Sequence, residues 1–176
     1  MSGPILSRGF TLLELLVAIT VSTILLVIGI PAFMQMIAGN QRSANSADLY
    51  SDLAFARAEA ISRNLQVGVC PSDDGATCAD GNDWRNGWLI YANTDNSTAG
   101  DEPDPDEPVL ASHGEIEGQF SLTGSGMTSP ILFLPSGRSR SQGRFELCPD
   151  DPGLKGRAVA ITSTGRPRIA NLDCGE

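Results

Sequence analysis

The chain has 176 residues, a formal net charge of −9 and a single histidine. This length allows one globular domain with a sizeable core, and so acidic a surface repels polyanions at long range. Aromatic residues make up only 6% of the chain, whereas 19 glycines and 11 prolines indicate a turn-rich body of short strands and argue against an all-helical domain.

The first predicted element is an apolar helix over residues 10–30. This stretch of 21 residues carries one charge, Glu14. As a helix it is long enough to span about 30 Å of hydrocarbon. We expect a membrane-spanning helix and not a cleaved secretory signal, because no small-residue cleavage site follows at Ile30 and Pro31.

The helical pattern resumes after Pro31 and continues through residues 31–64. Apolar side chains recur there on one face, whereas Arg57, Glu59 and Arg63 are available to water, which predicts an amphipathic half. A proline inside a helix is tolerated as a kink, so we expect one continuous helix over residues 10–63. The recurring apolar positions are Leu49, Leu53, Ala56 and Ala60.

After Asn64 the sequence changes to short runs of strand-forming residues separated by turns. These runs predict antiparallel sheets packed against the amphipathic half of the helix. The expected fold class is therefore α+β, with a long N-terminal helix and a β-sandwich-like head over residues 65–176. The runs are residues 65–70, 87–93, 108–112, 119–123, 131–134, 143–148 and 157–164.

Between two of these runs, residues 94–108 hold six acids, three prolines and no base. We expect them to form a solvated surface loop without a role in the core. No enzyme signature accompanies the chain: His113 has no second histidine or cysteine partner in a catalytic pattern, and we interpret it as a surface histidine. The two tryptophans, Trp84 and Trp88, are expected in the core or on a sheet face.

The four cysteines form no C-x-x-C pair, and with one histidine they argue against a zinc site. We expect no metal and no cofactor. Outside the cytosol four cysteines allow three disulfide pairings. We favour Cys70 with Cys78, which closes a short loop, and Cys148 with Cys174, which holds the C-terminal tail.

Glu14 requires an explanation because it lies in a membrane segment. Thr11 and Glu14 match the T-x-x-E capping box, which accounts for the residue type but not for its location. A carboxylate in a membrane segment usually has a partner. A positive partner at this depth becomes available if the chain is cut before Phe10, because the cut creates a free α-amine.

The segment "RGFTLLELLVAI", residues 8–19, resembles the class III signal of type IV pilins and pseudopilins. The resemblance implies that prepilin peptidase removes a leader, residues 1–9, by cutting after Gly9, and that Phe10 is then methylated. It also implies a protein held in the inner membrane with a periplasmic head and later built into a pilus. Glu14 would then face the amine of a neighbouring subunit and set the assembly register.

Three further segments resemble the GspH and FimT/FimU group: "LYSDLAFARAEAISRN" at residues 49–64, "FLPSGRS" at 133–139 and "TSTGRPRI" at 162–169. They imply a minor pilin that primes or joins a pilus together with other minor and major pilins. The alternative is a GspH-like pseudopilin of type II secretion that binds no DNA. A more distant one is a single-span membrane protein that never joins a filament.

Residues 137–168 hold seven bases against three acids in an otherwise acidic chain. In the FimT branch, a C-terminal G-R-x-R segment is associated with DNA binding during natural transformation, and residues 165–168 match it. Two arginines two apart on an extended segment project to one side and bind phosphates bidentately. We therefore expect Arg166 and Arg168, joined by Arg138 and Arg140 of the second G-R-x-R at residues 137–140, to contact double-stranded DNA.

The alternative is that these arginines offset acids or sit in turns where the glycine supplies a positive φ and the arginine is merely soluble.

Overall fold

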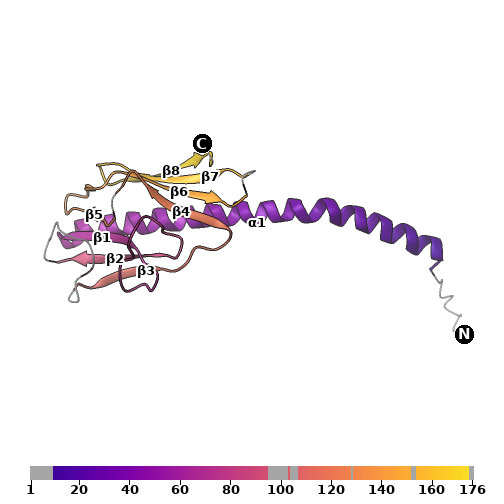
Figure 1. Cartoon of the computed structure of the whole chain (residues 1–176), viewed down its shortest axis with the longest axis horizontal. Helices are drawn as coiled ribbons and strands as arrows, with labels where there is room; N and C mark the ends of the chain where they lie inside the picture. The colour runs from indigo at the N-terminus through magenta and orange to yellow at the C-terminus, as the bar shows by residue number, and fades with distance from the viewer. Residues whose placement is uncertain (1–9, 95–102, 104–106, 128, 152–153, 175–176) are drawn as a thin grey trace, which may run out of the picture. The chain divides into compact units, whose positions relative to one another are not determined.

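The computed structural model describes residues 10–94, 103, 107–127, 129–151 and 154–174. It contains one long helix, α1, and two antiparallel sheets (Figure 1). The chain divides into two compact units, residues 1–39 and 40–176, and α1 (Leu12–Arg63) contributes to both. The prediction of a single helix running through Pro31 is confirmed.

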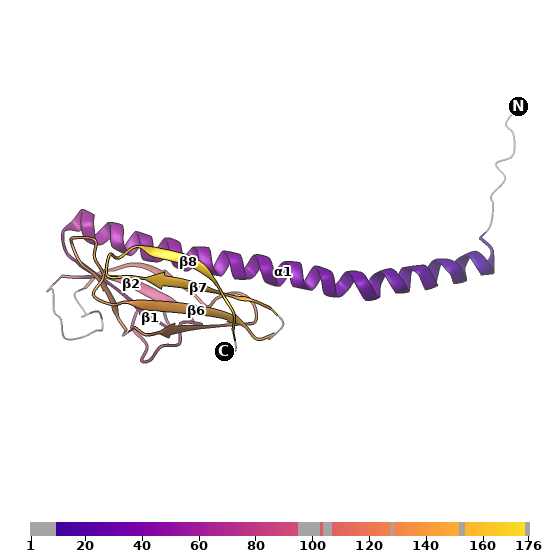
Figure 2. The same cartoon turned by 90° about the horizontal axis from the view of Figure 1, so that it is seen from above.

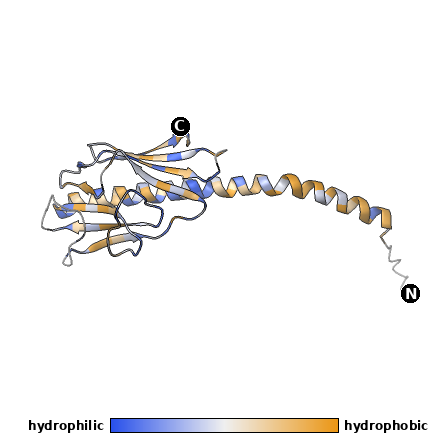
Figure 3. Cartoon of the chain, in the orientation of Figure 1, coloured by the Kyte–Doolittle hydropathy of each residue, from blue (hydrophilic) through white to orange (hydrophobic). Residues whose placement is uncertain are grey.

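The first unit consists of the N-terminal part of α1. The backbone amide of Glu14 donates a hydrogen bond to Thr11 Oγ1 at 3.2 Å, so Thr11 caps the helix as its position in the T-x-x-E pattern predicts. The side chains beyond this cap are almost all exposed, and Figure 3 shows that the residues of this part of α1 are mostly hydrophobic. By length and composition, α1 is the one helix in the described part of the chain that is able to cross a membrane.

The second unit, the head, contains two four-stranded sheets. Sheet A has the strand order β3-β2-β1-β5 and sheet B has the order β4-β6-β7-β8, with every pairing antiparallel. Figure 2 shows β6, β7 and β8 as neighbours. The predicted fold class is confirmed. The strands are β1 (Gln66–Pro71), β2 (Trp88–Asn93), β3 (Val109–His113), β4 (Phe120–Ser125), β5 (Ile131–Phe133), β6 (Gly143–Pro149), β7 (Gly156–Ile161) and β8 (Pro167–Leu172).

Seven of these strands overlap the seven predicted runs, but β8 was not predicted as a strand. It pairs with β7 alone, at the edge of sheet B, and most of its side chains are exposed. An edge strand of this kind lacks the apolar alternation that identifies a half-buried strand. Pro167 is compatible with it, because proline is tolerated as the first residue of an edge strand.

One core joins the helix to both sheets. The predicted helix positions Leu49, Leu53, Ala56 and Ala60 are buried and belong to the same apolar cluster as side chains from sheets A and B. Both tryptophans are buried, as predicted, and the ring of Trp84 meets that of Phe145 edge to face, with centroids 4.7 Å apart. The C-terminal half of α1 is thus a structural part of the head.

The two favoured disulfide pairings are both present, Cys70 with Cys78 and Cys148 with Cys174. The loop that the first disulfide closes packs on the outer side of sheet A, where Cys70, Leu89 and Tyr91 form a second, smaller buried cluster. This cover explains why every residue of β1 and β2 is buried, on both faces of the sheet. The second disulfide attaches the segment after β8 to β6.

The segment over residues 94–108, which was expected to be wholly solvated, departs from that expectation near its C-terminal end. Glu107 is 9% exposed, and its Oε1 accepts a hydrogen bond from the backbone amide of Thr94 at 2.7 Å. The expectation of a wholly solvated segment was therefore wrong for Glu107, because its carboxylate satisfies a backbone donor. Residues 95–102 and 104–106 of the same segment lie outside the described residues.

A polar contact fastens α1 to sheet A inside the head. The indole Nε1 of Trp88, whose side chain is fully buried, donates to Asp52 Oδ2 at 2.9 Å. His113 stacks on Trp88 with ring centroids 4.2 Å apart, and its Nδ1 lies 3.5 Å from the same carboxylate oxygen. His113 is therefore half-buried and packed, and its interpretation as a plain surface histidine was wrong.

We predict that Asp52→Ala lowers the free energy of unfolding by about 1–3 kcal/mol, because it leaves the buried indole donor of Trp88 without an acceptor. The measurement is guanidinium unfolding of the full chain in detergent, followed by tryptophan fluorescence. Asp48→Ala, an exposed carboxylate one turn earlier on α1, is the matched control and should change little. Equal effects of the two substitutions would contradict the role of Asp52.

Candidate functional site

The two G-R-x-R segments, far apart in the sequence, meet in the head. Gly137 lies in the turn after β5, and Gly165 lies in the turn between β7 and β8. Both have positive φ, 75° and 71°. A Cβ built on Gly165 would overlap the carbonyl oxygen of Gly137, so the two turns touch backbone to backbone. Glycine is required at Gly165 for both its φ and this close approach.

Helix α1 fixes the position of the first turn. The Nε of Arg57 donates a hydrogen bond to the carbonyl oxygen of Gly137 at 2.8 Å. A Cβ on Gly137 would lie 2.9 Å from Arg57 Nη2 and 2.8 Å from Ile61 Cδ1, so the ends of these two side chains would have to shift to make room for it. The amphipathic pattern predicted that Arg57 is available to water and gave no sign of this role, which depends on a contact across 80 residues.

The four candidate arginines follow Gly137 and Gly165 in the sequence, and all four are exposed. Arg138 and Arg140 flank the buried Ser139, and Arg166 and Arg168 flank the half-buried Pro167. In extended backbone alternate residues project to the same side, so each pair of guanidinium groups shares a side of its own segment. We call the four residues Arg138, Arg140, Arg166 and Arg168 the arginine corner.

Within the described residues, no side chain of the arginine corner forms a hydrogen bond or an ion pair with another residue. The alternative explanation, that glycine serves the turn, is correct for Gly137 and Gly165. It gives no reason for the arginines, whose charges offset no neighbouring carboxylate. Unpaired guanidinium groups gathered on touching turns are able to bind phosphate oxygens.

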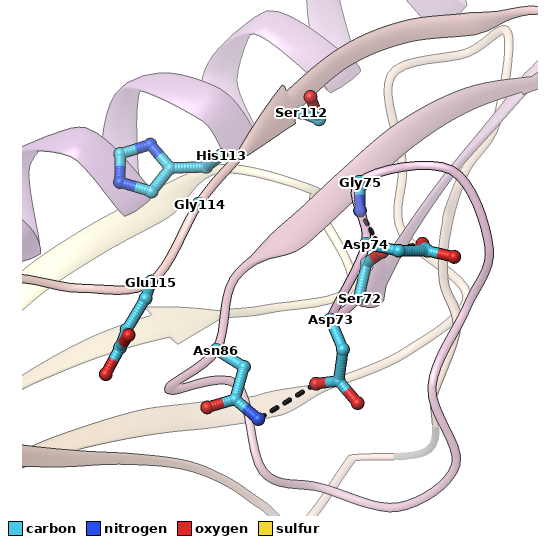
Figure 4. Close-up of a pocket in the computed structure, with 9 residues that line it drawn as sticks. All are labelled: Ser72, Asp73, Asp74, Gly75, Asn86, Ser112, His113, Gly114 and Glu115. Atoms are coloured by element: carbon cyan, nitrogen blue, oxygen red, sulfur yellow. Dashed lines mark hydrogen bonds between the residues drawn. The ribbon is translucent and has the colours of Figure 1, made fainter.

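A polar pocket of about 410 Å³ lies at the other end of sheet A, lined by residues 72–75 and 112–115 together with Asn86 (Figure 4). Asp73 accepts a hydrogen bond from Asn86 Nδ2 at 2.9 Å, and Glu115 lies 4.0 Å from Arg85. The backbone amides of Thr77 and Ala76, then the Thr77 hydroxyl, hold the pKa of the Asp74 carboxyl well below its usual range. This pocket is anionic, so it does not extend the arginine corner.

The N-terminal candidate residues lie in the other compact unit. Gly9 and the predicted leader over residues 1–9 are outside the described residues. Phe10 is 84% exposed. Glu14 is also exposed, and its carboxylate has no partner among the residues that the structure describes.

Two family models match the chain, one over most of the head and one over the N-terminal segment. The model described as "Type II transport protein GspH" matches residues 45–165, more than half of the chain, and the prokaryotic N-terminal methylation motif matches residues 6–30. The chain belongs to the GspH family. It is thus a minor pilin or pseudopilin, and its apolar helix and methylation motif are those of a membrane-anchored pilin.

Individual proteins are also similar to this GspH-family chain. The type IV major fimbrial protein FimA of Dichelobacter nodosus is 29% identical over 164 residues, which cover 78% of this chain and 98% of FimA. The type IV minor pilin FimU of Pseudomonas aeruginosa shares the fold, with a TM-score of 0.57 and 19% identity over 76% of this chain and 90% of FimU. A weaker likeness, with a TM-score of 0.47 and 15% identity, is to the minor pseudopilin EpsH of the Vibrio cholerae Type 2 Secretion System, over 77% of this chain and 99% of EpsH.

We predict that Gly165→Ala destabilises the head more than Gly126→Ala. Both glycines have a φ near +70°, and a Cβ there costs about 1–2 kcal/mol, but only Gly165 faces a backbone oxygen, whereas Gly126 has open space around it. The measurement is denaturant unfolding of the two variants. The loss of stability in Gly126→Ala reports the cost of the positive φ alone, and the additional loss in Gly165→Ala reports the cost of forcing the two turns apart. Identical losses would mean that the turns do not touch in solution.

Proposed function

We propose that this GspH-family chain is a minor type IV pilin that primes or joins a pilus and captures extracellular double-stranded DNA for uptake in natural transformation. The observation that carries the DNA-binding part is the arginine corner: four exposed, unpaired guanidinium groups on two turns that touch through Gly137 and Gly165. The assembly part is supported by the methylation motif over residues 6–30.

For assembly, prepilin peptidase cuts after Gly9 and the new N-terminus, Phe10, is methylated. The apolar part of α1 stays in the inner membrane, with the head in the periplasm, until the subunit joins other pilins. The Glu14 carboxylate, which has no partner within the described part of its own chain, then pairs with the amine of a neighbouring subunit. Such pairing is favourable because neither charge is well solvated in lipid.

For DNA capture, the arginine corner binds phosphates and does not read bases. Guanidinium groups match phosphate oxygens in pairs, and no exposed aromatic side chain accompanies the four arginines in the G-R-x-R segments to stack on bases. Binding is therefore weak, independent of sequence and sensitive to salt. The concentration of cations at one place allows local attraction despite the net charge of −9.

The second candidate function is that of a type II secretion pseudopilin, which is favoured by the description of the matching family as a type II transport protein. In that role the chain joins a short periplasmic filament and the arginine corner binds no DNA. Deletion of the gene distinguishes the two: loss of pili and transformation supports the first function, and loss of protein secretion supports the second.

We predict that the full chain in detergent binds a labelled DNA duplex with a log–log salt slope of about −3.6 if all four arginines contact phosphates, and that Arg166→Ala with Arg168→Ala halves the slope to about −1.8. The matched control, Arg85→Ala with Lys155→Ala, removes two cations that are ion-paired elsewhere on the head. In cells, the arginine variant should lose transformation and keep its pili. An unchanged slope would remove the arginine corner from the function.

We also predict that Glu14→Ala is processed and reaches the membrane but enters filaments poorly, because the neighbouring amine loses its partner. The readout is the amount of this subunit in sheared filaments relative to the membrane fraction. Thr20→Ala, which removes another exposed polar side chain from the same helix, is the control and should be incorporated normally. Normal incorporation of Glu14→Ala would refute the pairing.

A further inference from the structure

The outer face of sheet B carries many small side chains. The inner face of the sheet carries core residues such as Phe145, Leu147 and Val159, so the alternate positions point outward. Longer side chains on this face include those of Arg144 and Glu146 on β6 and that of Arg168 on the edge strand β8. The other outward positions near them are Ser121, Thr123 and Ser125 on β4, Ala158 and Ala160 on β7, and Ala170 on β8.

The register of the strands aligns two of these long side chains with the arginine corner. Arg144 is the direct partner of Ala160, and Ala160 is the direct partner of Arg168, so the three residues form one row across β6, β7 and β8. Two strand spacings separate the arginines by roughly 10 Å. The methyl group of Ala160 is the only side chain between them in this row. In the next row Ala158 lies between Glu146 and Ala170 and is itself only 5% exposed.

We infer that bound duplex DNA extends from the arginine corner over this outer face, with Arg144 as a further phosphate ligand. The inference rests on the proposed DNA-binding function and gives the path of the DNA on the head. Ala160 lies between Arg144 and Arg168, and its small side chain allows a phosphate backbone to lie close to the sheet there. Arg168 belongs to both surfaces and joins the corner to the face.

The stiffness of the ligand favours a flat surface. Duplex DNA has a persistence length of about 50 nm, so a short segment behaves as a rod and does not wrap around one corner. Further contacts with such a rod must lie along a level surface next to the first ones. The row from Arg144 to Arg168 on the outer face of sheet B offers such neighbouring contacts, because the one residue between the two arginines is Ala160.

Glu146 limits the contribution of Arg144. The Nε of Arg144 donates to Glu146 Oε1 at 2.6 Å, and the two side chains are 53% and 24% exposed. An exposed ion pair of this kind is weak, so a phosphate competes with the carboxylate for the guanidinium group. The remaining negative charge repels the phosphate. Removal of that charge should therefore strengthen DNA binding.

The experiment measures salt-dependent binding of a labelled DNA duplex to the full chain in detergent. With Arg144 as a fifth contact, the expected slope is about −4.5 for the wild type and about −2.7 for Arg166→Ala with Arg168→Ala. Arg144→Ala should make the log–log slope about 0.9 shallower, and Ala160→Lys about 0.9 steeper. Ala160→Glu should weaken binding at every salt concentration, and Ala170→Glu, on the exposed edge strand, repeats this test where the fold is less sensitive to substitution. Glu146→Gln should bind more tightly than the wild type.

Matched controls carry the same charge changes elsewhere. Val109→Lys and Val109→Glu alter an exposed residue of sheet A, and Glu117→Gln removes an exposed carboxylate outside both sheets. Each should change binding less than its counterpart on sheet B, because it alters only the net charge. Equal effects of the paired substitutions would overturn the inference.

The outcomes separate this inference from the proposed function. If Arg166→Ala with Arg168→Ala weakens binding while the substitutions at Arg144, Ala160 and Ala170 do not, the arginine corner remains the DNA site and the path over sheet B is wrong. If the wild type binds no DNA at low salt, both are wrong. If Ala160→Glu leaves DNA binding intact and prevents filament incorporation, the face contacts another pilin instead.

Discussion

Close approach of backbone segments is the constraint on which the head depends. Ala56 and Ala60 are fully buried and small, so this part of α1 lies close to the sheets. This proximity brings Arg57 to the carbonyl oxygen of Gly137, and the missing side chain at Gly137 leaves room for the guanidinium group. Gly137 in turn receives Gly165 from the other sheet. A chain of contacts from helix to turn to turn thus determines where the arginine corner forms.

Much of this fold could be predicted from periodicity. The helix, its cap at Thr11, seven strands and both disulfide pairings followed from local patterns or from cysteine spacing. The strand β8 could not be found in this way, because it is an exposed edge strand that begins with Pro167. The contacts of Asp52 with Trp88 and His113 were also invisible, since they join residues 36 positions or more apart and depend on the packing of α1.

The candidate site, like the fold, could be predicted from the sequence only in part. The spelling G-R-x-R occurs twice in the sequence, and the side-chain chemistry of arginine could be derived from it. That the two copies touch depends on the strand order, which places the β5–β6 and β7–β8 connections at one end of the head. The charge of the head is likewise divided in space: carboxylates line the pocket at one end of sheet A, and unpaired guanidinium groups lie at the other. The net charge of −9 therefore does not show that positive and negative side chains are gathered at opposite ends.

The disulfide between Cys148 and Cys174 has a consequence for the order of events in the life of the protein. It holds the segment after β8 on β6, while the turn at Gly165 holds the start of β8. Disulfides form and persist outside the reducing cytosol. The edge strand that carries Arg168 is therefore secured at both ends only after Cys148 and Cys174 have been oxidised, so the finished edge of sheet B depends on a covalent step that follows synthesis of the chain.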